Sequence, residues 1–309
     1  MSWRRLGRVF VPDGSIPWMR THAQVPTAFV VDDFVRVLIA TRDDSGRARV
    51  GVVDVDRRNP ERVVRIHDTP ALDFGEPGTF DEDGVMPSEV LEVDGALWMY
   101  YSGWNRKVST PYHNATGLAV SEDGGRTFRR LYQGPVLERS AEEPYLAVTP
   151  TVIRDGARFL CWYVSGLRWV DLDGRREPVY AIKHAHSLDG VHWVRPPELS
   201  IPQQHELEAY SRPCVRRTGG LWEMWYCFRH SLNFRDGAGS YRIGYATSSD
   251  GIRWQRRDDE AALLPATHGW DSMMICYPFV LDVDGSRLMF HNGNGFGRSG
   301  FGLCRLDAP

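Results

Sequence analysis

Five prolines recur along the chain at a nearly constant spacing. Successive members are separated by 61, 63, 63 and 65 residues and stand at Pro26, Pro87, Pro150, Pro213 and Pro278. Each lies in a short apolar segment such as VMPSEVLEV, which leads through a turn to a second segment rich in aromatic residues, such as ALWMYYSG. Self-similarity at a fixed period predicts one supersecondary unit repeated about an axis. Five such units account for nearly the whole chain.

Each unit is predicted to contain four antiparallel strands. Asp-Gly or Gly-Gly separates the first two strands of four units, and these pairs favour the tight turns of β-hairpins. A third strand then leads to a Ser-x-Asp-Gly turn, as in SLDGVHW at 187–193 and SSDGIRW at 248–254, with a looser copy at 121–128. Four strands repeated five times predict an all-β fold, a five-bladed β-propeller. We expect a single domain over 1–309, with blades beginning near residues 20, 80, 143, 206 and 271.

The prolines also predict which strand of each unit faces the axis. Proline cannot donate a ladder hydrogen bond, so it is confined to edge strands, and the innermost strand of a blade is such an edge. The fifth unit is one strand short, whereas LGRVFVP at 6–12 precedes the first unit without a partner. We predict that this N-terminal strand completes the last blade and closes the ring, and that Trp193 and Trp254 pack between blades.

Composition narrows the function. Apolar residues make up 42% of the 309 residues, enough for a core, and the net charge of −3 gives no reason to expect nucleic acid or a membrane surface as a partner. The five cysteines include no Cys-x-x-Cys pair, which indicates buried free thiols rather than a zinc site or disulfide framework. We expect a cytoplasmic protein, because no signal peptide or membrane-spanning apolar run is recognised. We expect no metal or cofactor. Oligomeric state is left open.

The motifs resemble those of a clan of five-bladed enzymes. A repeated Ser-Asp-Gly-Trp turn is similar to the glycoside hydrolase clan that contains families 32, 43, 62 and 68 and, more distantly, family 130. The segments FDEDGVMPSEV, EEPYLAVTP, IKHAHSLDGVHW and GWDSMMICYPFV look more closely like an uncharacterised bacterial group. Its members are usually labelled as such glycosidases and often encoded among genes for surface glycans or sugar-derived products. The resemblance implies a site at the mouth of the axial channel.

Acidic residues recur shortly before the anchor prolines of units two to five, and include Asp81, Asp83, Glu143, Glu208 and Asp271. Glycoside cleavage needs one protonated carboxyl group that gives its proton to the leaving oxygen and one ionised carboxylate. We expect Glu143 to be the general acid, with Asp81 or Asp83 as its partner and Asp271 as a third acid. In families 32 and 43 the second blade supplies an aspartate that tunes the site and the third a glutamate that acts as the acid, and the resemblance implies these roles for Asp81 or Asp83 and for Glu143.

The first unit departs from that family pattern, in which the first blade supplies an aspartate as nucleophile or base. Its segment THAQVP offers His22 and Gln24 and no carboxylate, and Asp43 in ATRDD does not match the family position. Either another acid, such as Asp271, takes the role, or the chemistry differs.

Further side chains are expected to contact the substrate. Arginines at strand ends can hold a phosphate or carboxylate through two N–H groups, with inter-blade salt bridges as the alternative, and they are Arg42, Arg212 and Arg229. The segment WNRKVSTPYHN is predicted to be a loop over the channel mouth that offers Trp104, Tyr112, His113 and Asn114. The remaining members of the predicted site are Glu208, Asn292, Asn294 and His184, the last being either a site residue or an inter-blade histidine.

Three functions follow from this reading. The first is a carbohydrate-active enzyme that cleaves a glycosidic bond by acid/base catalysis, by hydrolysis or phosphorolysis. The second is a non-hydrolytic enzyme of sugar or natural-product biosynthesis that uses the same channel-mouth site. The third is a sugar-binding propeller without catalysis. A small-molecule sugar, or a compound that contains one, is the expected partner in each case. An acidic pair inside the channel favours the first function, and its absence there favours the other two.

Overall fold

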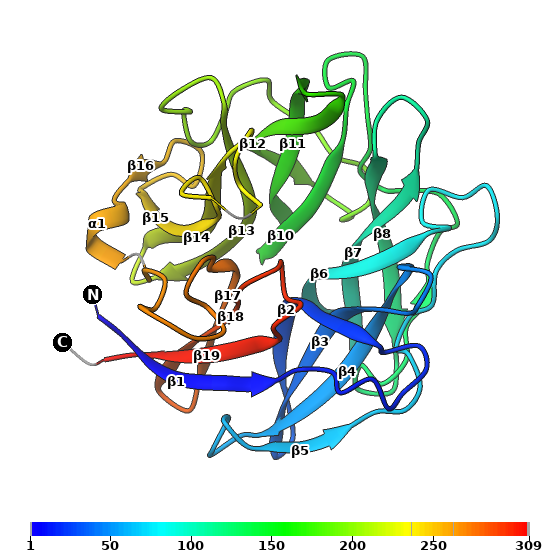
Figure 1. The fold of residues 1–309 in the computed structure, drawn as a ribbon, viewed down its shortest axis with the longest axis vertical. Helices are drawn as coiled ribbons and strands as arrows, with labels where there is room; N and C mark the ends of the chain where they lie inside the picture. Colours follow the sequence, from blue (N-terminus) through cyan, green and yellow to red (C-terminus); the bar gives the residue numbers. More distant parts are fainter. Residues whose placement is uncertain (1, 236, 262, 308–309) are drawn as a thin grey trace.

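The computed structural model describes residues 2–235, 237–261 and 263–307 and is built mainly of antiparallel β-strands. Hydrogen bonding divides the strands into four sheets (Figure 1). The largest consists of two antiparallel groups that are joined by a single parallel pair, Ala48 with Gly84. Its first group comprises β2 (Thr21–Val31), β3 (Phe34–Arg42), β4 (Ala48–Asp56) and β5 (Val63–Ile66). Its second group comprises β6 (Gly84–Val93), β7 (Ala96–Arg106), β8 (Tyr112–Ser121) and β9 (Arg129–Arg130).

The other three sheets follow in chain order. The next comprises β10 (Ala147–Asp155), β11 (Arg158–Leu172) and β12 (Arg175–Ser187). It is followed by β13 (Glu208–Thr218), β14 (Leu221–His230), β15 (Arg242–Ser248), β16 (Gln255–Arg256) and the short helix α1 (Asp258–Ala261). The last sheet comprises β17 (Cys276–Val283), β18 (Ser286–Asn292), β19 (Phe301–Leu306) and β1 (Trp3–Phe10).

The N-terminal strand completes the sheet formed by the C-terminal strands. β1 pairs antiparallel with β19, in a register that runs from Trp3 opposite Leu306 to Phe10 opposite Phe301. Figure 1 shows the blue N-terminal strand lying beside the red C-terminal strand. The pairing predicted for the segment before the first unit is therefore present.

The first strands of the five antiparallel groups, β2, β6, β10, β13 and β17, lie near the middle of the molecule (Figure 1). Each contacts the next in chain order, and β17 contacts β2, so these contacts form a closed cycle. The prolines used as sequence markers stand in these five strands. Later strands lie toward the periphery, and apolar side chains such as Leu38 and Val52 of the first group and Met99 of the second pack in one core cluster.

Each central strand carries a bulge at its proline, where the register of pairing shifts. In four of the strands the preceding residue adopts a left-handed backbone, with φ of 50°, 46°, 52° and 56° at Val25, Thr149, Arg212 and Tyr277. Such a conformation costs about 1–3 kcal/mol for a residue other than glycine. Side chains compensate by accepting backbone N–H groups: Asn292 Oδ1 from Val25 at 2.8 Å, and Ser102 Oγ from Thr149 at 3.0 Å. A bulge re-aims the residue that it contains.

The Ser-x-Asp-Gly turns connect neighbouring sheets. The carbonyl of Gly190 accepts a hydrogen bond from Tyr100 Oη at 2.8 Å, and that of Gly251 accepts one from Trp162 Nε1 at 2.7 Å. Trp193 meets the ring of Tyr100 edge-on with a centroid separation of 6.1 Å. Trp254 meets Trp162 in the same way at 6.0 Å. The tryptophans that end these turns therefore pack against the sheet before their own, as expected.

The outer strands are shorter than the four-strand unit predicts. β9 and β16 have two residues each, and in the third unit the outer pairing consists of isolated bridges, Lys183 with Leu199 and His186 with Val194. The turn aspartates account for part of this difference. Asp189 Oδ1, for example, accepts the backbone N–H groups of Val191 and His192 at 2.8 Å each. These donors are then not free to extend a ladder. Within the described residues, no helix is long and apolar enough to cross a membrane.

Candidate functional site

A cavity of about 390 Å³ lies where the central strands approach one another, and residues of all five line it. Its aromatic wall consists of Trp104, Tyr112, Tyr180, Tyr241 and Tyr277. Its polar side chains are Gln24, Asn114, Thr149, Ser211, Arg42 and Arg235, and its apolar ones are Val25, Met86, Pro111, Leu146, Val148 and Val164. No aspartate or glutamate of the described chain belongs to this lining. We call this space the axial cavity.

The bulges explain why the first strands contribute to the cavity. Four residues that immediately precede an anchor proline line it, namely Val25, Met86, Thr149 and Tyr277. A second contribution comes from the β7–β8 hairpin. Trp104 and Asn114 face each other in its ladder, and both line the cavity. The segment predicted to be a loop over the channel mouth is therefore largely strand, with its turn between β7 and β8 at residues 107–111.

The two cavity arginines differ in how their charge is compensated. Arg235 forms a bidentate ion pair with the buried carboxylate of Glu177, with N–O distances from 2.8 to 3.1 Å. Arg42 donates one side-chain hydrogen bond, from Nη2 to Gln24 Oε1 at 3.3 Å. Its Nε is buried without a partner, and no carboxylate of the described chain forms an ion pair with it. Burial lowers the pKa of Arg42, since the charged form is desolvated.

A buried arginine supports the tyrosine wall from behind. The hydroxyl groups of Tyr180 and Tyr241 lie 2.7 Å apart, and Arg229 donates to Tyr180 from Nη2 at 3.0 Å and to Tyr241 from Nε at 3.1 Å. The Arg229 guanidinium also stacks over the ring of Phe234 at 3.7 Å and donates to the carbonyl of Pro178 at 2.9 Å. Burial raises the pKa of Tyr241 well above its ordinary value. The hydrogen bonds therefore hold the hydroxyl groups of Tyr180 and Tyr241 in fixed positions.

The acids predicted to be catalytic do not line the axial cavity; each has partners within its own sheet region. Asp81 is fully buried and accepts hydrogen bonds from Tyr101 Oη at 3.0 Å and from Arg130 Nη2 at 2.7 Å. Glu143 is buried and accepts from the hydroxyls of Tyr163 at 2.8 Å and Ser165 at 2.5 Å.

Two other predicted acids are paired in a similar way. Asp271 is buried against Arg5 Nε at 3.1 Å, and its charge counteracts the burial that lowers the pKa of His291 to about 4. Glu208 accepts from Tyr210 Oη and from Arg256 Nη1, each at 2.7 Å. These contacts repeat from unit to unit, a pattern typical of structural groups.

Asp83 and Asp43 lie in turns. Asp83 accepts the backbone N–H of Arg106 at 2.8 Å. Asp43 accepts from Ser45 and from Arg49. Neither belongs to the cavity lining.

The predicted histidines lie at three separate places. His22 is half-buried with a φ of 64°, and burial together with the charges of Arg42 and Arg298 lowers its pKa to about 4. His113 is buried, with Glu138 at 3.8 Å, and burial lowers its pKa to about 4 as well. His184 lines a separate groove between β12 and β14. Of the three, only His22 has a cavity residue, Arg42, among its electrostatic neighbours.

Arg212, Asn292 and Asn294 bond to protein backbone. The fully buried Arg212 reaches from β13 to the two other central strands β6 and β2, donating to the carbonyl of Ser88 at 2.6 Å and to Thr27 Oγ1 at 2.8 Å. Asn292 donates to Ala23 and Gly300 carbonyls, and Asn294 Oδ1 accepts from Met273 and Met274.

Sequence reasoning identified five residues that line the cavity, Gln24, Arg42, Trp104, Tyr112 and Asn114. It missed Thr149, Tyr180, Arg235, Tyr241 and Tyr277. One signal was available for two of these, because Thr149 and Tyr277 directly precede anchor prolines. The side chains of Tyr180, Arg235 and Tyr241 come from outside the central strands, where the repeat carries no marker.

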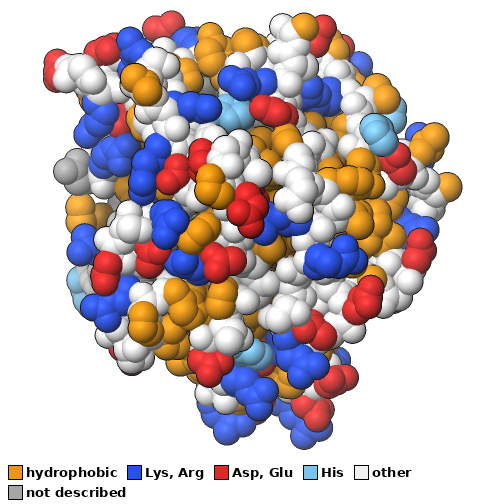
Figure 2. All heavy atoms as spheres, turned by 90° about the vertical axis from the view of Figure 1, so that its right-hand side faces the viewer, with side chains coloured by type: hydrophobic (Ala, Val, Ile, Leu, Met, Phe, Trp, Pro, Cys, Tyr) orange, Lys and Arg blue, Asp and Glu red, His pale blue; other side chains and the backbone are white. Residues whose placement is uncertain are grey.

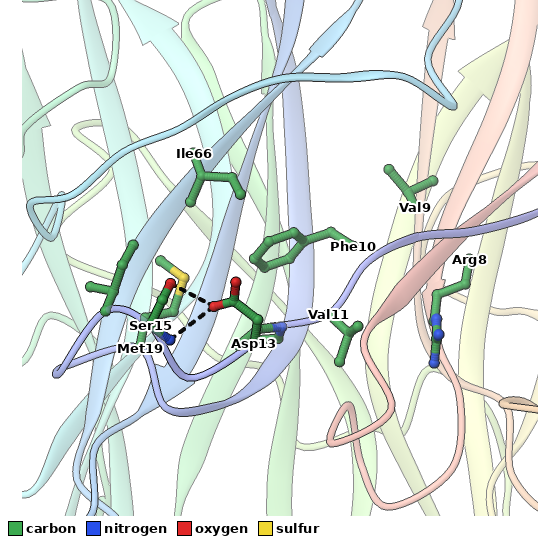
Figure 3. A pocket seen from close by; sticks show the side chains of 10 residues that line it. Arg8, Val9, Phe10, Val11, Asp13, Ser15, Met19 and Ile66 are labelled. Carbon is green, nitrogen blue, oxygen red and sulfur yellow. Dashed lines mark hydrogen bonds between the residues drawn. The ribbon is translucent and has the colours of Figure 1, made fainter.

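A second cavity of about 390 Å³ lies at the periphery, where the segment after β1 passes β5 (Figure 3). Phe10, Met19 and Ile66 supply apolar surface there, while Asp13 accepts hydrogen bonds from the N–H and hydroxyl of Ser15 at 2.9 and 2.6 Å. None of the described residues that line this peripheral cavity has a buried polar side-chain atom without a partner, in contrast to the axial cavity. Over the face drawn in Figure 2, acidic and basic side chains are interspersed. Within the described residues, no group of three His, Cys, Asp or Glu is placed to hold a metal ion.

Comparison with known proteins gives sequence relatives and structural neighbours. No family model matches the chain. Two Mycobacterium tuberculosis proteins, Uncharacterized protein MT1551 of strain CDC 1551 and Uncharacterized protein Rv1502 of strain H37Rv, are each 36% identical to it over 309 residues. The matches cover 99% of this chain and 100% of each relative.

The structural neighbours are glycoside hydrolases. A glycosyl hydrolase from Bacteroides ovatus aligns with a TM-score of 0.76 at 13% identity, over 99% of this chain and 94% of that one. A thermostable family-43 glycoside hydrolase gives 0.68 at 16% identity, over 96% and 93%. A family-130 structure, from work on hydrolases that target β-1,2 mannosidic linkages, gives 0.72 at 14% identity, over 99% and 94%. The chain therefore belongs to the family of the two mycobacterial proteins, and it has the fold of the propeller glycoside hydrolase clan.

Proposed function

We propose that residues 1–309 form one five-bladed β-propeller whose axial cavity binds a sugar. The closed cycle of contacts among β2, β6, β10, β13 and β17 supports five blades, each of which begins at the axis. The pairing of β1 with β19 supports closure through the last blade, which leaves only short protected edges. The segments before the anchor prolines then meet at one hollow, where the axial cavity lies.

The lining of the axial cavity is the observation that carries the proposal. Five aromatic side chains surround it together with polar side chains that include two arginines, and aromatic faces suit the C–H surfaces of pyranose rings. Concave sites with a few convergent polar groups are the usual small-molecule sites of proteins. The glycoside hydrolases with the same fold add support for a carbohydrate as the bound class.

The same lining favours a site that works without a pair of cavity carboxylates. A glycosidase of the usual type needs two acids that flank the scissile bond. Glu143 and Asp81 are instead buried with hydroxyl and guanidinium partners outside the cavity lining. These contacts support structural roles for the acids. We infer a sugar-binding propeller, or a non-hydrolytic enzyme of sugar or natural-product biosynthesis, in preference to acid/base cleavage of a glycosidic bond.

Saturation-transfer NMR with a panel of neutral and charged monosaccharides and disaccharides tests the proposal. We expect transfer to ring protons of at least one sugar in the wild-type protein, and its loss in Trp104→Ala. Tyr132→Ala is the matched control, because Tyr132 is exposed and lies outside the cavity lining. The same signal in wild-type protein and Trp104→Ala, or transfer that depends on Tyr132, would contradict the placement of the sugar.

A further inference from the structure

We propose that Arg42 binds an anionic group, a carboxylate or a phosphate, carried by the sugar in the axial cavity. The inference rests on the proposed function and adds the charge class of the ligand and the residue that recognises it. The guanidinium of Arg42 fits such a group because its planar N–H fork matches the oxygens of both anions.

The first support is the missing counter-charge. Arg235, which also lines the cavity, is held by the carboxylate of Glu177. Arg42 has a neutral partner only, Gln24 Oε1 at 3.3 Å, and no carboxylate of the described chain pairs with it. Arg42 is half-buried, and desolvated cations are ordinarily paired, because an unpaired one keeps the cost of its desolvation. A ligand anion would supply the missing partner.

The second support is a set of buried polar atoms, on residues around the cavity, that have no hydrogen-bond partner. Arg42 Nε, Thr149 Oγ1 and Asn114 Oδ1 all line the cavity region, are shielded from solvent and lack a hydrogen bond. Buried polar atoms normally have partners, so unsatisfied ones require an explanation. Arg42 Nε and the Thr149 hydroxyl can donate to anion oxygens, while the Asn114 amide can contact sugar hydroxyls. Three such atoms around one cavity point to a polar ligand.

The third support is the sign of the surrounding charge. The cavity lining contains two arginines and, within the described chain, no acid that would repel an anion. Glu177, the carboxylate behind Arg235, forms ion pairs with Arg235 and with Arg175, each at 2.8 Å. Arg298 and Arg42 both act on His22 as positive neighbours. The potential at the Arg42 end of the cavity is therefore positive, which attracts anions.

Isothermal titration calorimetry at low salt with four probes tests the inference: D-glucose, D-glucuronate, D-glucose 6-phosphate and inorganic phosphate. We expect an anionic sugar to bind at least about tenfold more tightly than D-glucose, the effect of one charge-assisted contact. Arg42→Gln should remove this difference, and Arg42→Lys should retain part of it. Arg154→Gln, an exposed arginine whose ion pair is with Asp94, is the matched control and should change nothing.

The outcomes separate the two proposals. Preference for glucuronate assigns a carboxylate, and preference for glucose 6-phosphate assigns a phosphate; inorganic phosphate that competes with the preferred anionic sugar supports one anion site for both. If neutral sugars bind in a Trp104-dependent manner and anionic ones gain nothing, the anion inference fails while sugar binding stands. If none of the four probes binds and the wider sugar panel gives no Trp104-dependent signal, both proposals fail. Circular dichroism of each Arg42 variant shows whether the fold is retained.

Discussion

Glu143 Oε1 accepts a hydrogen bond from Tyr163 Oη at 2.8 Å, and the same oxygen lies 3.8 Å from both Lys183 Nζ and Arg195 Nε. Its other oxygen accepts from Ser165 at 2.5 Å. The residue that the sequence marked as a general acid is thus the centre of a buried polar cluster. Its contacts define the first test of the account.

Glu143→Gln should lower the free energy of unfolding by about 1–3 kcal/mol, because a neutral amide leaves buried cations without their counter-charge. Affinity for a cavity ligand should stay within about twofold of the wild type, since Glu143 lies outside the cavity lining. Urea unfolding and calorimetric titration measure the two quantities. A variant of unchanged stability whose turnover of a glycoside falls by about 100-fold would instead assign Glu143 as the general acid.

Arg212→Met should destabilise the fold by about 3 kcal/mol or more, because the carbonyls that Arg212 serves in two other central strands would be left buried without a donor. Thermal unfolding by scanning calorimetry measures the change. Arg217→Met is the matched control, because Arg217 is exposed and pairs with Asp155 at 3.4 Å. Equal unfolding temperatures for the two variants would show that Arg212 does not join the central strands.

Arg229→Lys should weaken binding in the axial cavity by about tenfold, since an ammonium cannot hold both tyrosine hydroxyls and stack on Phe234 at once. Near-ultraviolet circular dichroism reports the change in the tyrosine wall, and calorimetry reports affinity. Arg217→Lys is a suitable control, because Arg217 also stacks on an aromatic ring, that of Trp222, and lies outside the cavity lining. Undiminished affinity in Arg229→Lys would remove the tyrosine pair from the binding surface.

Stability should fall as the pH is lowered from about 6.5 toward 4. Burial lowers the pKa values of His22, His113 and His291 to about 4 from the ordinary 6.5, so these side chains are neutral when folded and gain protons on unfolding within that window. The unfolded state binds more protons there, and the free energy of unfolding therefore rises with pH until about 6.5 and is unaffected by these groups above it. Urea unfolding at pH 5 and 7 measures the slope. His113→Gln should flatten it, and an identical slope would show that His113 is not held neutral.

Binding of an anion beside Arg42 should raise the pKa of His22. The pKa of His22 is lowered by burial and by the positive charges of Arg42 and Arg298. A bound anion offsets these two charges. The imidazole proton resonances of His22, assigned through His22→Gln, follow the titration with and without ligand. A neutral sugar should leave the titration unchanged, and the same upward shift with a neutral sugar would contradict an electrostatic cause.

The sequence made the arrangement of strands predictable because proline and Asp-Gly act through the backbone. Pro87 and Pro213 stand in central strands, and the Gly190 and Gly251 turns join neighbouring sheets, as their chemistry requires. The outer strands were less predictable, since the turn aspartates use backbone donors that a longer ladder would need.

The site was harder to read than the strands. The acids shortly before each anchor proline were prominent in the sequence, but it is the residue directly before the proline that a bulge directs to the cavity, as at Thr149 and Tyr277. Register within a bulge depends on partners distant in sequence, such as Ser102 for Thr149. A pattern along one chain segment does not contain that information.

The most direct measurement is a crystal structure of the protein soaked with the sugar that binds most tightly in the calorimetric panel. The account predicts electron density for one sugar within the axial cavity, with an anionic oxygen within hydrogen-bond distance of the Arg42 guanidinium and the ring against Trp104 or the tyrosine wall. Density beside Glu143 and Asp81, or in the groove that contains His184, with an empty axial cavity, would contradict it.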